Sequence, residues 1–327
     1  MLNSTKLKRS DKYELLRIVS AITIMLNHIN VSFSPVVSSV GNVNKYVIQF
    51  FHLGGKFGVN IFVILGCYFL CNTEFKAKRI WRLIGEVIFY ALLLNLADIL
   101  IFKKDLTSID FIHGFSYWFP FAYIVMLIFI PFINKFIIPR FQKFIVILGS
   151  VLSIVFVLWG YLAPNAIFKL ITLEQIMGSL WFCYTYVLVG YLKENNIFDK
   201  TNYIKSAPIV FIICYFSMYI IVLATNNSVI RDMYSPLCFV SALCLFYMFH
   251  HLSDFSYGWI QALSGCTLGT YLLQCHNNTA YIWEKEIFKY SAFSDSILLI
   301  PLCIGSIILL YLLAWFINLI YKKIGRI

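Results

Sequence analysis

Residues 14–34 read ELLRIVSAITIMLNHINVSFS, an apolar run that contains two ionisable side chains, Arg17 and His28. A helix needs about 20 residues to cross the apolar part of a bilayer, so this run is long enough. Eleven helical steps of about 100° come to three turns and roughly 20°, so both side chains lie on one face, about 16 Å apart along the axis. The stretch therefore predicts a membrane-spanning helix with a cation near one end and an imidazole toward the other.

The composition of the whole chain agrees with a membrane protein. Of its 327 residues, 61% are hydrophobic and 13% are charged, and the mean hydropathy is +0.81. Soluble domains have about 25% charged residues, so a water-soluble globule is excluded. The stretches between apolar runs are too short for a soluble domain, and we expect one integral-membrane domain over residues 1–327 with no appended soluble domain.

Apolar runs predict an all-α polytopic protein with about ten transmembrane helices. They lie at residues 14–34, 47–71, 79–102, 118–134, 144–163, 176–192, 207–225, 234–250, 261–283 and 297–321. Seventeen lysine and arginine residues fall on the side of the termini and eight on the other, so the positive-inside rule predicts that both termini are cytoplasmic. The excess positive charge then reflects topology and attraction to anionic membrane lipids, and no nucleic-acid partner is expected.

Ionisable groups inside a membrane span are costly, so each indicates a functional site or a buried pair. His28 and His276 are expected at similar depth, nearer the outer face, because the first and ninth spans run in the same direction. His28 is either catalytic or a hydrogen-bonded structural residue, and His276 is either functional or in contact with headgroup water. Arg17 either extends to the headgroups and pairs with Glu14, three residues earlier on the same face, or holds an anionic ligand.

Four basic residues crowd the expected cytoplasmic mouth between the second and third spans: Lys76, Lys78, Arg79 and Arg82. They either set the topology or form a docking site for phosphates, which arginine and lysine both bind well. Nine cysteines lie in or beside apolar spans, and Cys67 and Cys71 share a helix face. Two thiols without further ligands are more typical of packing than of metal binding, so no metal site is expected.

Several short motifs occur in an order that resembles a known family. They are Glu14-Leu15-Leu16-Arg17 leading to His28, Gly58-Val59-Asn60-Ile61-Phe62 closing with Gly66-Cys67-Tyr68, the basic residues from Lys76 to Arg82, Trp118-Phe119 ahead of Pro131, Gly190 with Tyr191, and Gly269-Thr270-Tyr271-Leu272 leading to His276. In these motifs the whole chain resembles the membrane-bound acyltransferase-3 family, the O-acyltransferases of bacterial surface polysaccharides. Leu65 and Tyr117 depart from the pattern, since the family usually has a serine before the glycine and often a histidine before the tryptophan.

The resemblance implies an acetyltransferase of the bacterial cytoplasmic membrane. It would move an acetyl group from cytosolic acetyl-coenzyme A (acetyl-CoA) to a hydroxyl of an extracytoplasmic polysaccharide or lipid-linked glycan, with no permanently bound cofactor. The phosphates of the donor would bind Arg17 and the four basic residues Lys76, Lys78, Arg79 and Arg82. His28, together with Glu14, would be catalytic, either as a general base or as a transient acyl-histidine.

Other polar side chains are candidates for contacting substrate or stabilising the oxyanion of acyl transfer: Asn27, Asn60, Tyr271, Gln274 and His276. A rival interpretation is a transporter or flippase for acyl groups or a lipid-linked glycan, which would use the same buried polar groups as a path. A third is a structural scaffold for glycan assembly. The sequence leaves open whether a partner chain or a second copy takes part.

Overall fold

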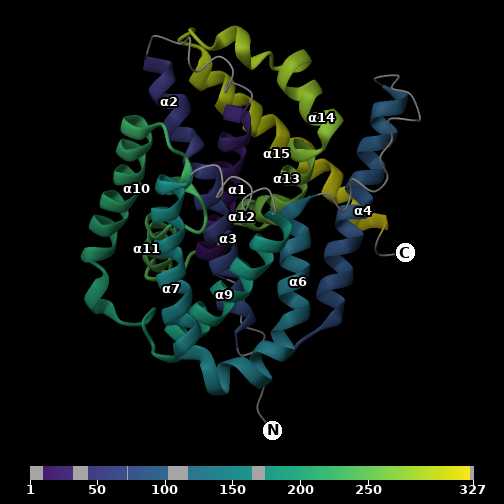
Figure 1. Cartoon of the computed structure of the whole chain (residues 1–327). Helices are drawn as coiled ribbons and strands as arrows, with labels where there is room; N and C mark the ends of the chain where they lie inside the picture. Colours follow the sequence, from purple (N-terminus) through teal and green to yellow (C-terminus); the bar gives the residue numbers. More distant parts are fainter. Residues whose placement is uncertain (1–9, 32–42, 72, 102–116, 164–173, 325–327) are drawn as a thin grey trace.

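The computed structural model describes residues 10–31, 43–71, 73–101, 117–163 and 174–324, and within these ranges every regular element is helical (Figure 1). The longer helices are α1 (Asp11–Val31), α3 (Gly54–Leu70), α4 (Ala77–Leu100), α6 (Trp118–Phe132), α7 (Ile138–Leu162), α9 (Glu174–Glu194), α10 (Ser206–Thr225), α11 (Pro236–His250) and α15 (Leu299–Ile324). The shorter ones are α2 (Val43–His52), α12 (Gly258–Ser264), α13 (Thr267–Cys275) and α14 (Asn277–Tyr281). The prediction of an all-α protein is confirmed for this part of the chain.

Each predicted span contains at least one helix. The second is built from α2 and α3, and the ninth from α12, α13 and α14, so apolar runs that look continuous in sequence are divided in space. The first helix begins at Asp11, three residues before its predicted start, because Asp11 and Glu14 place negative charge in the first turn, where the helix dipole favours it. Residues 32–34 and 102, at the ends of the first and third predicted spans, lie outside the described residues.

Six stretches of the described chain are long and apolar enough to cross a membrane: Val43–Leu70, Ala77–Leu100, Trp118–Leu162, Ser206–Thr225, Val229–His250 and Leu299–Ile324. The third of these has 45 residues. As one straight helix it would measure about 68 Å, more than twice the thickness of the apolar core of a bilayer. The chain instead reverses at the π-helical turn η2 (Ile133–Ile137), and α9 lies between α6 and α7 and contacts both (Figure 1). A count of about ten spans stays a prediction.

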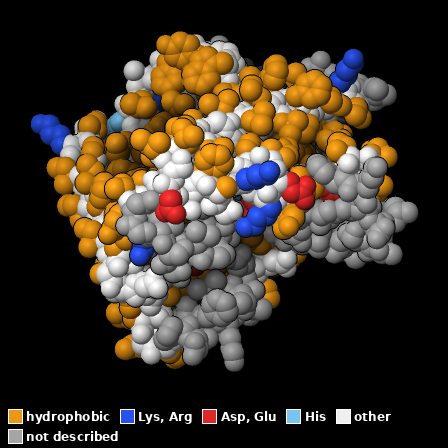
Figure 2. Space-filling model, turned by 90° about the horizontal axis from the view of Figure 1, so that it is seen from above, with side chains coloured by type: hydrophobic (Ala, Val, Ile, Leu, Met, Phe, Trp, Pro, Cys, Tyr) orange, Lys and Arg blue, Asp and Glu red, His pale blue; other side chains and the backbone are white. Residues whose placement is uncertain are grey.

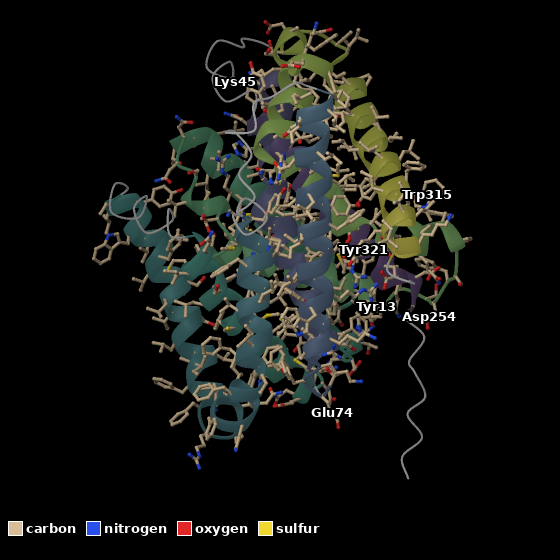
Figure 3. All side chains as sticks on the ribbon, turned by 90° about the vertical axis from the view of Figure 1, so that its right-hand side faces the viewer. Tyr13, Lys45, Glu74, Asp254, Trp315 and Tyr321 are labelled. Carbon is tan, nitrogen blue, oxygen red and sulfur yellow. The ribbon has the colours of Figure 1, made fainter. Side chains whose placement is uncertain are left out.

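The two ends of the helical bundle differ in the residues they carry. Lys45, at the start of α2, lies at the opposite end of the molecule from Glu74, which precedes α4, and Tyr13 and Asp254 lie in the half nearer Glu74 (Figure 3). We call the end with Glu74 the basic end, since Lys76, Lys78, Arg79 and Arg82 follow it directly, and the end with Lys45 the far end. Helix α1 therefore runs from the basic end toward the far end.

Helix α1 lies in the interior and contacts α2, α3, α11, α12, α13 and α15. Its contact with α3 is antiparallel and very close. A Cβ atom added to Gly58 of α3 would lie 2.5 Å from Thr23 Oγ1 and 2.7 Å from Ser20 O of α1. The hydroxyl of Ser20 donates to the carbonyl of Gly58 at 2.7 Å. Gly54 and Gly58 thus form the small-residue spacing that allows two membrane helices to bring their backbones together.

The contact of α1 with α12 and α13 is parallel and is fixed at the basic end by polar groups. Asp11, which is buried, accepts hydrogen bonds from the backbone N–H of Tyr257 and from Gln261 Nε2 at 2.9 Å. Lys12 Nζ donates to the carbonyls of His250 and Leu252, at 2.9 and 3.0 Å. These bonds set the register of α1 against the segment that joins α11 to α12.

Hydrophobic side chains cover much of the periphery. Large apolar residues of α7, α10 and α15 are exposed on the protein, among them Leu162, Ile220 and Phe316. Seen from above, lysine, arginine and acidic side chains form small groups within a mainly hydrophobic surface (Figure 2). This distribution is typical of helices that face lipid.

Candidate functional site

Arg17 lies on α1 with its side chain directed into the protein. Its guanidinium Nη1 donates to Glu14 Oε2 at 2.7 Å, and its Cζ atom lies 6.0 Å from the centre of the Phe62 ring on α3. The side chains of Arg17 and Glu14 are 19% and 7% exposed. A guanidinium held between a carboxylate and an aromatic ring is a fixed internal cation rather than one that extends to lipid headgroups.

His28 lies eleven residues after Arg17 on the same continuous helix, so the two are about 16 Å apart along the axis. The Nδ1 atom of His28 is 3.2 Å from Gln274 Oε1 of α13, and Gln274 Nε2 donates to the carbonyl of Met25 at 3.1 Å. Because the Met25 carbonyl can only accept, the NH₂ group of Gln274 must face it, and the amide oxygen must face His28. The oxygen can only accept too, so Nδ1 of His28 carries the proton and Nε2 carries the lone pair.

The thiol of Cys275, the last residue of α13, lies against the same imidazole. Its Sγ atom is 3.3 Å from His28 Nδ1 and 3.8 Å from Nε2. The ring of Tyr271, one helical turn earlier, lies 5.9 Å from the ring of His28, and its side chain hydrogen-bonds the thiol. Tyr271 and Gln274 were predicted from the sequence, but Cys275 was not, because a thiol in an apolar run is most often a packing residue.

A cavity of about 30 Å³ lies between Arg17 and His28 along α1. Its lining includes Ala21, Ile24 and Met25 of α1, Phe62, which contacts Arg17, and Tyr271, which contacts His28. The cavity is lined by neighbours of both Arg17 and His28, but by neither of these two residues. Its volume is enough for one or two water molecules.

A larger hollow lies elsewhere along the described chain. It has a volume of about 560 Å³, opens between α7 and α9, and is lined by apolar and aromatic side chains with Ser153 but no acidic, basic or histidine residue. If the site were chosen by volume alone, this groove would be preferred to the small cavity beside α1. We place the site at the small cavity instead, because acyl transfer needs a base and polar donors, and these gather there.

The structure places the other nominated polar residues as follows. Asn27 packs against Gly55 of α3, where any Cβ atom would overlap its side chain. Asn60 is fully buried, donates through Nδ2 to the carbonyl of Met233 at 3.0 Å, and accepts through Oδ1 from Trp181 Nε1 at 2.9 Å. With both ends of its amide engaged in joining α3 to α9 and to the segment before α11, Asn60 is positioned for packing rather than for an oxyanion.

His276 faces α4 and not α1. Its Nδ1 atom is 2.9 Å from Thr279 Oγ1 and 3.7 Å from Asp98 Oδ2, and both His276 and Asp98 are almost fully buried. The sequence left headgroup water as the alternative partner of His276, whereas a buried carboxylate takes that place. The pair holds α4 beside the end of α13, next to the imidazole site.

Glu14 and His28 are not brought together. They are fourteen residues apart on one straight helix, so about 21 Å separates them along its axis, and the carboxylate contacts Arg17 instead. A catalytic role for Glu14 stays a prediction, and Glu14 does not contact His28. Glu14 positions the guanidinium and neutralises it in the interior.

The basic residues lie where α3 turns into α4. Arg79 Nη1 donates to Thr73 Oγ1 at 3.2 Å and is within 3.5 Å of the carbonyl of Glu74, which fixes this turn. The side chains of Lys76, Lys78 and Arg82 are exposed. Helix α4 begins at Ala77, so its first N–H groups and the positive end of its dipole lie among these cations, an arrangement suited to phosphate.

The described residues contain no group of three or more histidine, cysteine or acidic side chains able to hold a metal ion. Cys67 contacts the sulfur of Met126 and Cys71 contacts the carbonyl of Tyr186, at 3.8 and 3.9 Å. Both thiols pack within the core that joins α3, α6 and α9.

The comparison with protein families decides the assignment. A family described as an acyltransferase domain matches residues 11–317, which is nearly the whole chain and includes every residue of the site above. The chain belongs to the acyltransferase-3 family. No curated protein and no solved structure gives a match. An acyltransferase-3 domain with several helices able to cross a membrane is a multi-pass membrane acyltransferase.

Proposed function

We propose that this acyltransferase moves an acetyl group from acetyl-CoA, bound at the basic end, to a hydroxyl of a polysaccharide or lipid-linked glycan beside His28. The observation that supports this most is the shared face of α1. One helix carries an internal cation and an imidazole about three turns apart, with an apolar cavity between them. A long, flexible thioester donor needs an anion-binding site and a reaction centre separated in this way.

The donor's phosphates are assigned to the basic end. Lys76, Lys78 and Arg82 are exposed beside the first turn of α4, and Arg79 lies half-buried beneath them. Phe62, which contacts Arg17, is eight residues from the end of α3, so the guanidinium lies roughly 12 Å further inside. We assign Arg17 to an inner phosphate or to the polar part of the donor's arm.

His28 acts as the general base in this proposal. Gln274 holds the proton on Nδ1, so Nε2 is the atom that takes the proton of the acceptor hydroxyl as its oxygen attacks the thioester carbonyl. The positioned histidine of a hydrolase triad is held in the same way, by a group that fixes its tautomer. Tyr271, whose ring lies beside His28, is the hydroxyl that we assign to the oxyanion.

The cavity must widen when the donor enters. At about 30 Å³ it is far smaller than a pantetheine arm, and its walls are side chains of four helices, α1, α3, α6 and α13. Phe62, Phe119 and Tyr271 are large rings at these walls, so a change of their rotamers opens space without unwinding a helix. Water stays excluded from the thioester while the walls are closed.

The test is acetyl transfer from labelled acetyl-CoA to envelope glycan by the purified, full-length protein. His28→Ala should lower the rate by about 100-fold or more, the usual contribution of a general base. His251→Ala is the matched control, since this histidine lies at the end of α11 near the basic end, and its variant should retain the rate. If His28→Ala, present in the membrane at the same level as the wild type, transferred acetyl groups at the wild-type rate, His28 would have no part in the mechanism.

Donor binding is tested separately by thermal protection. Acetyl-CoA at 100 times its Kd should stabilise the folded protein by about 2.7 kcal/mol. A Lys78→Ala, Arg82→Ala variant should lose this protection, whereas Lys45→Ala at the far end should keep it. A transporter or flippase for a glycan would not be stabilised by acetyl-CoA. If acetyl-CoA stabilised both variants equally, the basic residues would serve only to set the membrane topology.

A further inference from the structure

We propose that Cys275 accepts the acetyl group as a thioester before it passes to the acceptor, so that transfer proceeds in two chemical steps. This inference rests on the proposed function and extends it to a second catalytic residue. Cys275 and Gln274 come from the end of α13, and His28 comes from α1, so the three side chains meet only in the folded protein.

The geometry is that of a nucleophile with its base and the residue that orients the base. The thiol Sγ atom lies 3.3 Å from Nδ1 and 3.8 Å from Nε2 of His28, and Gln274 Oε1 contacts Nδ1 at 3.2 Å. Nε2, which carries the lone pair, is within reach of the S–H group. Cysteine, histidine and an amide or carboxylate are the groups that act together in this kind of covalent catalysis.

The location of the thiol explains why it needs that base. Cys275 is the last residue of α13, and the negative end of a helix dipole disfavours a thiolate. The resting side chain is therefore a neutral thiol, which is a poor nucleophile until His28 removes its proton. The Tyr271 hydroxyl hydrogen-bonds the thiol, so it is placed beside the carbonyl oxygen that would become negative during attack.

Other thiols of the described chain have different partners. Cys266, at the opposite end of α13, lies 3.0 Å from the carbonyl of Leu263. Cys71 and Cys67 contact the carbonyl of Tyr186 and the sulfur of Met126. These contacts satisfy a thiol in a packed core, whereas contact with an imidazole prepares one for reaction.

The limited space around His28 also favours two steps. Met25, Leu272 and Leu273 beside the site are 0 to 1% exposed, and the adjoining cavity measures about 30 Å³. A donor arm and an acceptor sugar are both much larger than this volume. If the acetyl group is held on Cys275, the donor can leave before the acceptor enters, and the two need never occupy the site together.

The proposed chemistry balances without an oxidant or a second co-reactant. In the first step His28 takes the proton of Cys275, the sulfur attacks the acetyl carbonyl, the bond to the sulfur of coenzyme A breaks, and coenzyme A leaves with the proton. In the second step His28 takes the proton of the acceptor hydroxyl, the oxygen attacks the acetyl group on Cys275, and the thiolate leaves and regains the proton. One thioester replaces another and is then exchanged for an oxygen ester.

The experiment incubates the full-length protein with labelled acetyl-CoA in the absence of acceptor, followed by denaturation and mass analysis. The wild type and the control Cys266→Ala should each gain one acetyl group, which neutral hydroxylamine removes as expected for a thioester. Cys275→Ala and His28→Ala should gain none. Cys275→Ser should retain thermal protection by acetyl-CoA, and any acetyl group it gains should resist hydroxylamine as an oxygen ester.

The outcomes separate this inference from the proposed function. Loss of transfer by about 100-fold in Cys275→Ala, with donor protection intact in Cys275→Ser, supports the covalent step. Transfer by Cys275→Ala within about twofold of the wild type overturns it and leaves His28 acting directly on the acceptor. Absence of both protection and transfer in the wild type rejects the proposed function itself.

Discussion

Helix α1 meets its two principal neighbours in contrasting ways. Against α3 the contact is between backbones, because Gly54 and Gly58 remove the side chains that would keep the helices apart. Against α13 the contact is between side chains, and Gln274 and Cys275 reach across to His28. The first contact fixes where α1 lies, and the second supplies groups able to react. Substitutions on the two faces should therefore separate stability from chemistry.

The largest effect on chemistry alone is expected from Gln274→Leu. Without the amide, nothing at this position holds the proton on Nδ1, and the rate should fall by about 100-fold, or about 2.7 kcal/mol of transition-state stabilisation. Gln274→Glu still offers an acceptor and should recover part of the rate with a changed pH profile. Gln175→Leu, at an exposed position of α9, is the control and should behave as the wild type. Equal rates for Gln274→Leu and the wild type would contradict the assigned tautomer.

The face toward α3 is tested by Gly58→Val. The added side chain would overlap Thr23 and Ser20 of α1, so the free energy of unfolding should fall by about 1 to 3 kcal/mol. Gly305→Val on α15 is the matched control, because nothing lies within 4 Å of a Cβ atom at that exposed position. Thermal unfolding in detergent measures both variants. A similar loss in the two would mean that the close α1–α3 contact is not specific.

These two faces also show what the sequence could predict. The apolar run predicted α1, and helical periodicity predicted that Arg17 and His28 share a face and that Glu14 lies three residues before Arg17, where the structure finds the ion pair. Periodicity reports on one helix at a time. It could not show that His28 would meet Cys275, 247 residues later, since the pairing of helices depends on how their whole surfaces fit.

Asn60 and Asp98 also show that the sequence does not reveal which side chains a buried polar residue will meet. Both are polar residues inside apolar runs, which is a reason to expect function, yet Asn60 joins three parts of the core through its amide. Asp98 is likewise buried, against His276. Hydropathy gives the approximate depth of a residue in the membrane and not the direction of its side chain, which neighbouring helices determine.

Substitution of Arg17, the internal cation, is expected to have a smaller effect on the reaction. Arg17→Lys keeps the charge but loses the planar group that contacts both Glu14 and Phe62. The KM for acetyl-CoA should rise about 10-fold while kcat changes by less than about twofold, because the chemistry at His28 is untouched. Arg231→Lys, in the turn η4 (Val229–Arg231), should leave the donor KM unchanged. A fall in kcat with an unchanged KM would place Arg17 in the chemical step.

The smallest effect is expected at the surface of the basic end. The hydroxyl of Ser10 donates to Asp254 at 2.6 Å and Lys12 lies 3.2 Å away, and these contacts lower the pKa of Asp254 below its ordinary value of 3.8. A lowered pKa gives stability that is present above the ordinary value and lost as the pH falls through the lowered one. The melting temperature of Asp254→Asn should therefore be slightly below that of the wild type at neutral pH and equal to it in strong acid. Melting curves that differ equally at both pH values would exclude this ion pair as the cause.

The bonds of Asp11 connect the beginning of the chain with its last quarter. Its carboxylate accepts hydrogen bonds from Tyr257 and Gln261, about 250 residues later in the chain. His28 likewise contacts Gln274 and Cys275, which are far from it in the sequence. During synthesis α1 can pair with α3 early, but the imidazole gains its partners only when almost the entire polypeptide has been inserted. A nascent or truncated chain therefore has His28 without Gln274 and Cys275, two residues that contact its imidazole in the complete protein.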